Sequence, residues 1–374
     1  MTFVEPAYGG RSLSDVMPAV ACALGVDVGY APVGLELPPA PSYVVMLVDG
    51  MGRELLAAHK DHAPYLHGLL NGPGDLGAGT SGVPSTTAVS LTSLGTGLTP
   101  GEHGLVGYTS RVPGTDHLLN ALQWDKTIEA TDWQPHETAF DRLSRAGVVT
   151  TTVNKRAFQN SGLTVSSQRG AAFVGGDHVG ERIAAAAEAS SRAPSMTYLY
   201  ESDLDWTGHK FGVDSAQWRQ QLITVDAQVE QLREALHPST RIVILADHGM
   251  VDSGPNSRVD VDTTEGLRDG VLLLGGEARF RHVYVEDGAL DDVLATWREV
   301  LGDRALVLPR AEAVQRGWFG AVEDRVLPRL GDVIAATTAD NALVSSKDFP
   351  YETQLIGMHG SLTGVEMLVP LLVD

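Results

Sequence analysis

A carboxylate and an imidazole lie four residues apart in the stretch DWTGHKFG (205–212), shortly after the apolar run MTYLY (196–200). They belong to Asp205 and His209. On a helix this spacing puts both side chains on one face, and in a loop Gly208 lets the backbone turn so that both converge. This pair commonly binds zinc or another divalent ion. The alternative is a solvated loop in which the aspartate caps a helix.

A second pair, Asp247 and His248, follows the run RIVILA (241–246) without a spacer. Adjacent residues of a regular strand point in different directions, so both can face one ion only where the strand ends and the backbone twists. Gly249 makes that bend easy. Two polar groups at the end of a buried strand are costly unless they are paired or bind a metal.

Two further candidates are weaker when taken alone. Asp49 follows the run YVVMLV (43–48) and precedes two glycines, so it is either an acidic ligand or a helix cap. His359, in GMHGSLT, is a single histidine before a glycine, and such residues are usually incidental. With the two pairs above they make three carboxylates and three imidazoles. That set is enough for two metal ions with open positions, an arrangement suited to in-line displacement at phosphorus.

The stretch GVPSTTAVSLTSLGTG (82–97) contains seven hydroxyl side chains and no charge. A polar run of this kind is typical of a surface loop. The alternative is that Thr86 or Thr87 is a nucleophile. A hydroxyl is a poor nucleophile near neutral pH unless a base or a metal ion activates it. The stretch therefore gains a chemical role only if other parts of the chain bring cations to it.

Short apolar runs alternate with helical patterns over most of the chain, which predicts an α/β fold with a mostly parallel central sheet flanked by helices. In such sheets the functional residues gather beyond the carboxyl ends of the strands. We predict strands at 43–48, 148–152, 196–200, 241–246 and 367–373, and helices at 13–24, 53–60, 136–145, 178–190 and 215–236.

The pattern of predicted strands and helices changes after about residue 255. We predict a main metallohydrolase core at 1–255, a small α/β cap or insertion at 256–350, and a return to the core at 351–374. The last segment supplies His359 and the final strand.

The order of these motifs resembles the alkaline phosphatase superfamily, and most closely its nucleotide pyrophosphatase/phosphodiesterase-like branch. The family order is an Asp after the first strand, a Thr or Ser nucleophile, DxxGH, DHG and a late His followed by Gly. This sequence has Asp49, PSTT (84–87), DWTGH (205–209), DHG (247–249) and HG (359–360) in that order. LGTGLTPGEHGLVGY (94–108) also looks like the stretch that follows the family's nucleophile. The resemblance covers about 42–252 and 355–373 and leaves the cap uncovered.

The resemblance implies a division of the metal ligands. Asp49, Asp247 and His248 would bind one ion together with the nucleophile, and Asp205, His209 and His359 would bind the other. The family's usual metal is zinc. Its pattern places the nucleophile three residues after a proline, and counting from Pro84 selects Thr87, with Thr86 as the alternative. A covalent intermediate on this threonine would then be hydrolysed.

The substrate contacts are where the sequence departs from the family. Where phosphodiesterases and phosphonoacetate hydrolases have an Asn that donates to the phosphoryl oxygen, this sequence has Tyr108, in GLVGYTS. A phenol can donate the same bond but is longer. Lys155 is the nearest basic candidate for a substrate contact, and the alternative is an exposed loop cation.

Composition limits the partners. The 47 acidic and 27 basic residues give a formal charge of −20, which repels nucleic acids and anionic membranes, so we expect neither a nucleic acid duplex nor a membrane as partner. The single cysteine, Cys22, lies in the apolar stretch VMPAVACALGV and is interpreted as buried. The N-terminal stretch lacks a signal-peptide pattern, and we expect a cytoplasmic protein. The sequence does not indicate an oligomeric state.

The resulting hypothesis is a two-metal phosphohydrolase that cleaves phosphodiester or pyrophosphate bonds of a small phosphorylated substrate such as a nucleotide. A phosphonate hydrolase or a phosphomonoesterase on the same metal core is the alternative within enzymes. An inactive scaffold of the same fold is the alternative from another class.

Overall fold

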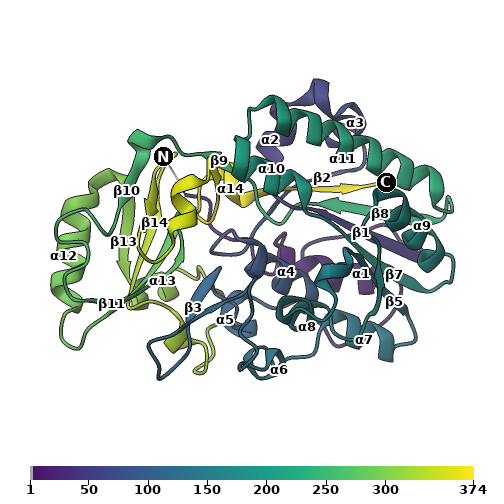
Figure 1. Ribbon diagram of the computed structural model, residues 1–374. Helices are drawn as coiled ribbons and strands as arrows, with labels where there is room; N and C mark the ends of the chain where they lie inside the picture. The colour runs from purple at the N-terminus through teal and green to yellow at the C-terminus, as the bar shows by residue number, and fades with distance from the viewer. Residues whose placement is uncertain (1–2) are drawn as a thin grey trace.

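The large central sheet positions most of the candidate residues. In the computed structural model, which describes residues 3–374, it has seven strands, with helices on both faces (Figure 1). Strands β1 and β7 are buried along their whole length, which explains why they read as continuous apolar runs. In spatial order the strands are β2 (Asp75–Thr80), β17 (Leu368–Val373), β8 (Thr240–Leu245), β1 (Ser42–Val48), β7 (Ser195–Glu201), β5 (Val149–Asn154) and β6 (Ala172–Gly175).

The sheet is mostly parallel, as predicted. Strand β1 lies between β8 and β7 and is parallel to both, with Val48 level with Glu201 and Leu47 level with Leu245. The carboxyl ends of these three strands therefore meet at one edge. Strand β17, predicted at 367–373, is antiparallel to both of its neighbours. Strands β2 and β6 were not predicted, because Gly and Ala dilute their apolar pattern.

Two groups of helices cover the sheet (Figure 1). The Ser215 hydroxyl caps α11 by accepting a hydrogen bond from the Trp218 amide, as expected from the sequence. One face carries α2 (Arg53–Ala58), α3 (Pro64–Leu70), α9 (Val179–Ser190) and α11 (Ala216–Ala235), and the other carries α1 (Val16–Ala23), α4 (Thr87–Thr96), α7 (Ala139–Arg145) and α8 (Gly162–Gln168). Helix α10 (Asp203–Phe211) follows β7 at the edge where the strands end.

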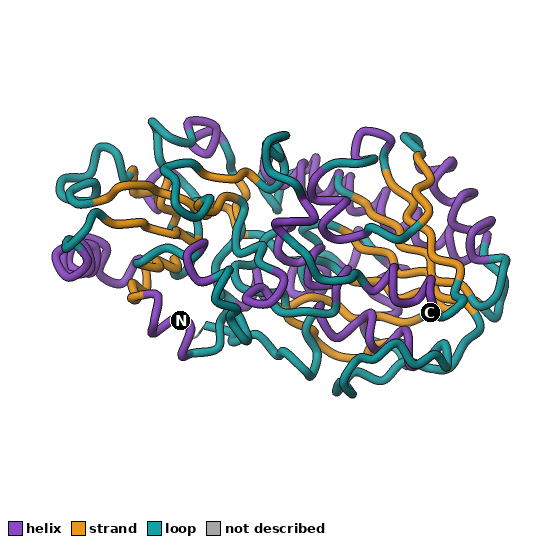
Figure 2. The backbone as a smooth tube through the Cα atoms, turned by 90° about the horizontal axis from the view of Figure 1, so that it is seen from below, coloured by secondary structure: helices purple, strands orange, loops and turns teal. Residues whose placement is uncertain are grey.

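A second sheet lies beside the first and is antiparallel throughout (Figure 2). Its own apolar core packs against α12, and a further apolar cluster on its other side includes Phe3 and Val4 from the chain's start. It consists of β11 (Val271–Glu277), β12 (Phe280–Val285), β14 (Val333–Thr337) and β13 (Ala305–Pro309), with α12 (Leu290–Leu301) and α13 (Arg310–Gln315). All these elements lie within 256–350, although the domain boundaries themselves stay a prediction.

Short elements complete the chain. They are the strand pairs β3 (Thr109–Arg111) with β4 (Leu118–Asn120), β9 (Val251–Asp252) with β16 (Gly357–Met358), and β10 (Arg258–Asp260) with β15 (Ala342–Val344); the helices α5 (Pro100–His103), α6 (Ala130–Trp133) and α14 (Gly364–Met367); and the 3-10 helices η1 (Leu13–Asp15), η2 (Lys60–His62), η3 (Arg156–Phe158), η4 (Pro255–Ser257), η5 (Gly302–Arg304), η6 (Leu327–Arg329) and η7 (Pro350–Gln354). Among the described residues, no helix combines the length and the apolar character needed to cross a bilayer.

Candidate active site

Two neighbouring strands, β1 and β8, deliver the first candidate ligand set. Asp49 follows β1, and Asp247 and His248 follow β8 directly beside it. The His248 Nε2 atom lies 3.5 Å from Asp49 Oδ1 and 3.3 Å from Asp247 Oδ2. A side chain on Gly249 would collide with the Val365 carbonyl, so the turn after Asp247 can pass this close only without a Cβ. One acidic or imidazole atom from each of the three residues lies within 4.8 Å of the others.

The second set assembles on α10 and the strand β16. Asp205 and His209 share one face of the helix, and His209 Nε2 lies 3.3 Å from Asp205 Oδ2. The helical interpretation of DWTGH is therefore right. His359 follows β16, whose pairing with β9 carries it back to the segment just after Asp247. Its Nε2 atom is 3.3 Å from the His209 Nε2 atom and 3.8 Å from Asp205 Oδ1.

All three imidazoles are oriented in the same way. The Nδ1 atoms of His209, His248 and His359 lie 2.8 to 2.9 Å from the carbonyl oxygens of Gly357, Gly249 and Ser85, respectively. A carbonyl only accepts hydrogen bonds, so each Nδ1 carries the proton and each Nε2 of a neutral ring has a free lone pair. Free Nε2 lone pairs directed at one another repel unless a cation lies between them.

The three aspartates are each left with one unsatisfied oxygen. Asp49 Oδ2 accepts a hydrogen bond from the Tyr200 hydroxyl, and Asp247 Oδ1 accepts from the Gly50 and His248 amides. Asp49 Oδ1, Asp205 Oδ1 and Asp247 Oδ2 are buried and have no partner. Buried orphan oxygens beside free imidazole nitrogens fit two divalent cations, one per set.

The pKa values of the three aspartates also depend on how much positive charge lies nearby. Burial raises the pKa of Asp49 well above its usual value, and the neighbouring charges of Asp247 and Asp205 raise it further. Burial also raises the pKa of Asp247. At Asp205 burial acts in the same direction, but the charges of His209 and His359 outweigh it and lower the pKa. The first set is therefore the more costly one to ionise without a bound cation.

The hydroxyl-rich stretch is buried and its larger part is the helix α4, so its interpretation as a surface loop is wrong. Every residue of α4 is buried. The hydroxyls of Thr92 and Thr96 donate to backbone carbonyls one turn earlier, and Ser90 donates to the Asp247 carbonyl. The polar side chains are thus satisfied locally, which allows a helix with few apolar residues to be buried.

The two candidate threonines occupy different places at the start of α4. Thr86 is the N-cap residue, but its side chain makes no capping hydrogen bond. Thr87 is the first residue of the helix, and its Oγ1 atom lies 3.3 Å from His248 Nε2. Of the two, the geometry therefore favours Thr87 as the residue beside the first ligand set.

A pocket of about 300 Å³ opens in front of both threonines. Tyr108 lines it, and the Tyr108 oxygen accepts a 2.7 Å hydrogen bond from the Asn120 amide, which leaves the phenolic proton free. Lys155 does not line it. The Lys155 ammonium instead donates to Ser202 and forms an ion pair with Asp203, so the structure does not support a substrate contact for Lys155.

Sequence reasoning missed several residues of this site. Tyr200, which donates to Asp49, is an ordinary strand residue by sequence. Glu277 reaches the pocket from the predicted cap at 256–350, and Tyr351 and Glu352 reach it from η7 at the start of the last predicted segment; no motif could be read at these positions. Burial raises the pKa of Glu277 to about 8. Only the packing of the cap against the core reveals these residues.

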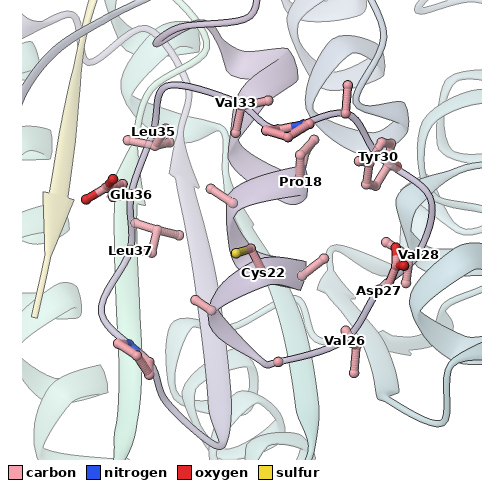
Figure 3. Close-up of a pocket in the computed structure, with 17 residues that line it drawn as sticks. Pro18, Cys22, Val26, Asp27, Val28, Tyr30, Val33, Leu35, Glu36 and Leu37 are labelled. Carbon is pink, nitrogen blue, oxygen red and sulfur yellow. The ribbon is translucent and has the colours of Figure 1, made fainter.

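Cys22 lies far from this chemistry in a separate pocket of about 700 Å³, which is built by α1 and the loop that follows it. Figure 3 shows Cys22 on α1, encircled by that loop. The side chain is exposed, so its interpretation as buried is wrong. The loop stands away from the exposed face of the helix instead of packing on it.

We expect the Cys22 thiol to react with a disulfide reagent in the native protein without loss of activity, because Cys22 does not line the pocket beside Thr87. Release of one thiolate per chain, measured by absorbance, would be lost in Cys22→Ser. Inactivation on labelling would contradict this separation of the two pockets.

A family model and several solved structures are similar to this chain. The family model for type I phosphodiesterase / nucleotide pyrophosphatase matches residues 43–362. No curated protein matches the chain. Among solved structures, murine ectonucleotide pyrophosphatase/phosphodiesterase 5 is similar, with 17% identity and a TM-score of 0.70 over 88% of this chain and 87% of that one. An inactive form of it was solved with AMP. Phosphonoacetate hydrolase from Sinorhizobium meliloti, solved with phosphonoacetate, has 19% identity and a TM-score of 0.66 over 91% of each chain.

Proposed function

Because the chain belongs to the type I phosphodiesterase / nucleotide pyrophosphatase family, we propose that it is a two-metal phosphohydrolase that cleaves phosphodiester or pyrophosphate bonds through a covalent intermediate on Thr87. The observation that carries the proposal is the position of the Thr87 hydroxyl, 3.3 Å from an imidazole of the first ligand set and in the wall of the pocket.

The residues that would hold the ions are the two sets already described. Asp49, Asp247 and His248 would bind one ion, and the second would be bound by Asp205, His209 and His359. Zinc is the metal we propose, since the ligands are carboxylates and imidazoles. When bound, such ions activate a hydroxyl and neutralise the charge that develops around phosphorus.

Helix α4 adds a second attraction for the phosphoryl group. Thr87 is its first residue, so the positive end of the helix and its free amides point toward the position of the scissile phosphorus. In the proposed reaction the Thr87 oxygen bonds to phosphorus as the first ester bond breaks. Water then cleaves the phosphoryl-threonine and restores the hydroxyl.

Tyr108 is proposed to donate its phenolic proton to a phosphoryl oxygen. The bond from Asn120 holds the ring in place and leaves that proton unused. We expect Tyr108→Phe to lower kcat/KM by about 10- to 100-fold, because a donor to a charged oxygen is lost. Steady-state assays would measure this. Lys155→Ala, which lies outside the pocket, is the control, and an equal loss in both variants would contradict the assignment.

A phosphonate hydrolase is the second candidate, favoured by the similarity to the fold of phosphonoacetate hydrolase. The discriminating experiment supplies the zinc-loaded protein with bis(4-nitrophenyl) phosphate, 4-nitrophenyl phosphate and phosphonoacetate. We expect the highest kcat/KM for the diester. A preference for the monoester or for phosphonoacetate would overturn the diesterase proposal.

A further inference from the structure

One carboxylate in the pocket has no partner and no place in the metal sets. Glu277 is the last residue of β11, is 8% exposed and lines the pocket beside Thr86 and Thr87. Neither of its oxygens has a hydrogen-bond partner. The Thr86 hydroxyl is directed at this carboxylate and lowers the pKa of Glu277 as a hydrogen-bond donor would, although the contact falls short of a full hydrogen bond.

Other buried glutamates of the described chain are paired. Glu366 forms two hydrogen bonds with Arg279, Glu201 pairs with Arg182, and Glu352 pairs with Arg281. Among the described residues, the carboxylates with buried orphan oxygens are the three candidate metal ligands and Glu277. Because the first three fit bound cations, the fourth has the same need for a positively charged or donating partner.

Neighbouring cations of the protein do not meet that need. Arg281 lowers the pKa of Glu277 through its charge, but it forms its ion pair with Glu352 and donates its Nε hydrogen to the Leu343 carbonyl. Over the part of the chain that the structure describes, neither a lysine nor an arginine lines the pocket. Glu277 also lies outside the two groups that could each hold a metal ion.

The rest of the wall suits a cation as well. The rings of Tyr108, Trp206 and Tyr351 line the pocket, and aromatic faces attract ammonium groups. In the same wall Glu352 is paired with Arg281 and Asp205 belongs to the second ligand set, so Glu277 is the carboxylate left without a partner. An anionic substituent beside Glu277 would be repelled, and a plain alkyl group would leave Glu277 buried and unpaired.

We propose that Glu277 binds an ammonium group on the substrate, so that the enzyme selects phosphodiesters of amino alcohols. This inference rests on the proposed function and names its substrate class. The ammonium N–H groups donate to the Glu277 oxygens while the phosphoryl group lies at Thr87.

The test uses three 4-nitrophenyl diesters that differ in the second alcohol, namely 2-aminoethyl, propyl and carboxymethyl. With zinc-loaded protein we expect kcat/KM for the aminoethyl ester to exceed that for the propyl ester by about 10- to 100-fold, with the carboxymethyl ester lowest. Glu277→Gln removes the charge at nearly constant size and is expected to bring the aminoethyl-to-propyl ratio close to one. Glu299→Gln, an exposed glutamate on α12, is expected to keep the ratio.

The ratio is measured within one preparation, so partial misfolding of a variant does not change it. A propyl ester as good as the aminoethyl ester, or a ratio that survives Glu277→Gln, would overturn the inference while leaving the phosphodiesterase proposal intact. A ratio that survives Glu277→Gln would mean that an uncharged side chain at position 277 is sufficient for the preference, which excludes a contact selective for the ammonium charge.

If the protein hydrolyses none of the three diesters, a binding measurement still tests the ammonium contact of Glu277 separately from the phosphodiesterase activity. Calorimetry on zinc-loaded Thr87→Ala would compare 2-aminoethylphosphonate with propylphosphonate. Tighter binding of the aminoethyl compound, lost on adding Glu277→Gln, would support the inference even if the protein hydrolysed none of the three diesters. Equal binding of the two compounds would overturn it.

Discussion

Thr87→Ala is expected to lower kcat/KM for a phosphodiester by about 10³-fold or more, because it removes the only atom proposed to bond to phosphorus. The hydroxyl lies 3.3 Å from His248 Nε2 at the start of α4, and alanine is a good helix residue, so we expect the variant to fold. Acid-quenched protein should carry a covalent adduct on the peptide containing Thr87, detectable by mass spectrometry, and the variant should not.

Thr86→Ala is the matched control. Its hydroxyl makes no capping hydrogen bond, and its contact with Glu277 falls short of a full hydrogen bond. We therefore expect kcat/KM to stay within about threefold of the wild-type value, since only a weak polar contact is lost. If Thr86→Ala abolished turnover and Thr87→Ala retained the adduct, the nucleophile would be the neighbouring residue.

Removal of the metal ions is expected to abolish turnover and to lower the melting temperature by about 5 °C or more, the shift that corresponds to ions bound at about 100 times their Kd. The physical reason is the buried oxygen on each of Asp49, Asp205 and Asp247 that has no partner and that a bound cation would satisfy. Calorimetry with and without a chelator measures the shift. Metal analysis of the holoprotein should give two ions per chain.

Single ligand variants refine this prediction. We expect Asp205→Ala and His359→Ala to lose turnover and one ion per chain while remaining folded, whereas Asp269→Ala, an exposed aspartate, should change neither. Full activity in either ligand variant would exclude the two-metal proposal. A well-folded wild-type protein that contains far less than one ion per chain, and does not take up zinc on dialysis, would support the inactive scaffold.

Asp49→Asn is expected to raise the stability of the metal-free protein and to lower the stability of the zinc-loaded protein. Burial and the neighbouring Asp247 and Asp205 raise the pKa of Asp49, so its charge is unfavourable without a metal. Metal-free Asp49→Asn should therefore melt at a higher temperature than the metal-free wild type, while the zinc-loaded variant should melt lower than the zinc-loaded wild type. A variant that is less stable in both states would mean that Asp49 is held by its bond with Tyr200 and not by a cation.

The sequence by itself determined the buried central strands of the large sheet and the positions where these strands end. Strands β1, β7 and β8 are buried on both faces, so their apolar runs are unmistakable, and polar residues directly after such runs must lie at the carboxyl edge. The spacing of Asp205 and His209 likewise belongs to local helix geometry. These features depend on residues that are close together in the chain, so the local sequence pattern is enough to predict them.

Only the tertiary structure decided the features that depend on distant contacts. Most of the run at 82–97 forms the buried helix α4, because its hydroxyls donate to carbonyl groups within the helix and after β8. Lys155 forms an ion pair with Asp203. Cys22 is exposed because the following loop stands away from it. Glu277 lines the pocket although it belongs to the second sheet. In each case the outcome was set by which remote group satisfied a polar atom or covered an apolar face, and neither is encoded in the residue type or in its local spacing.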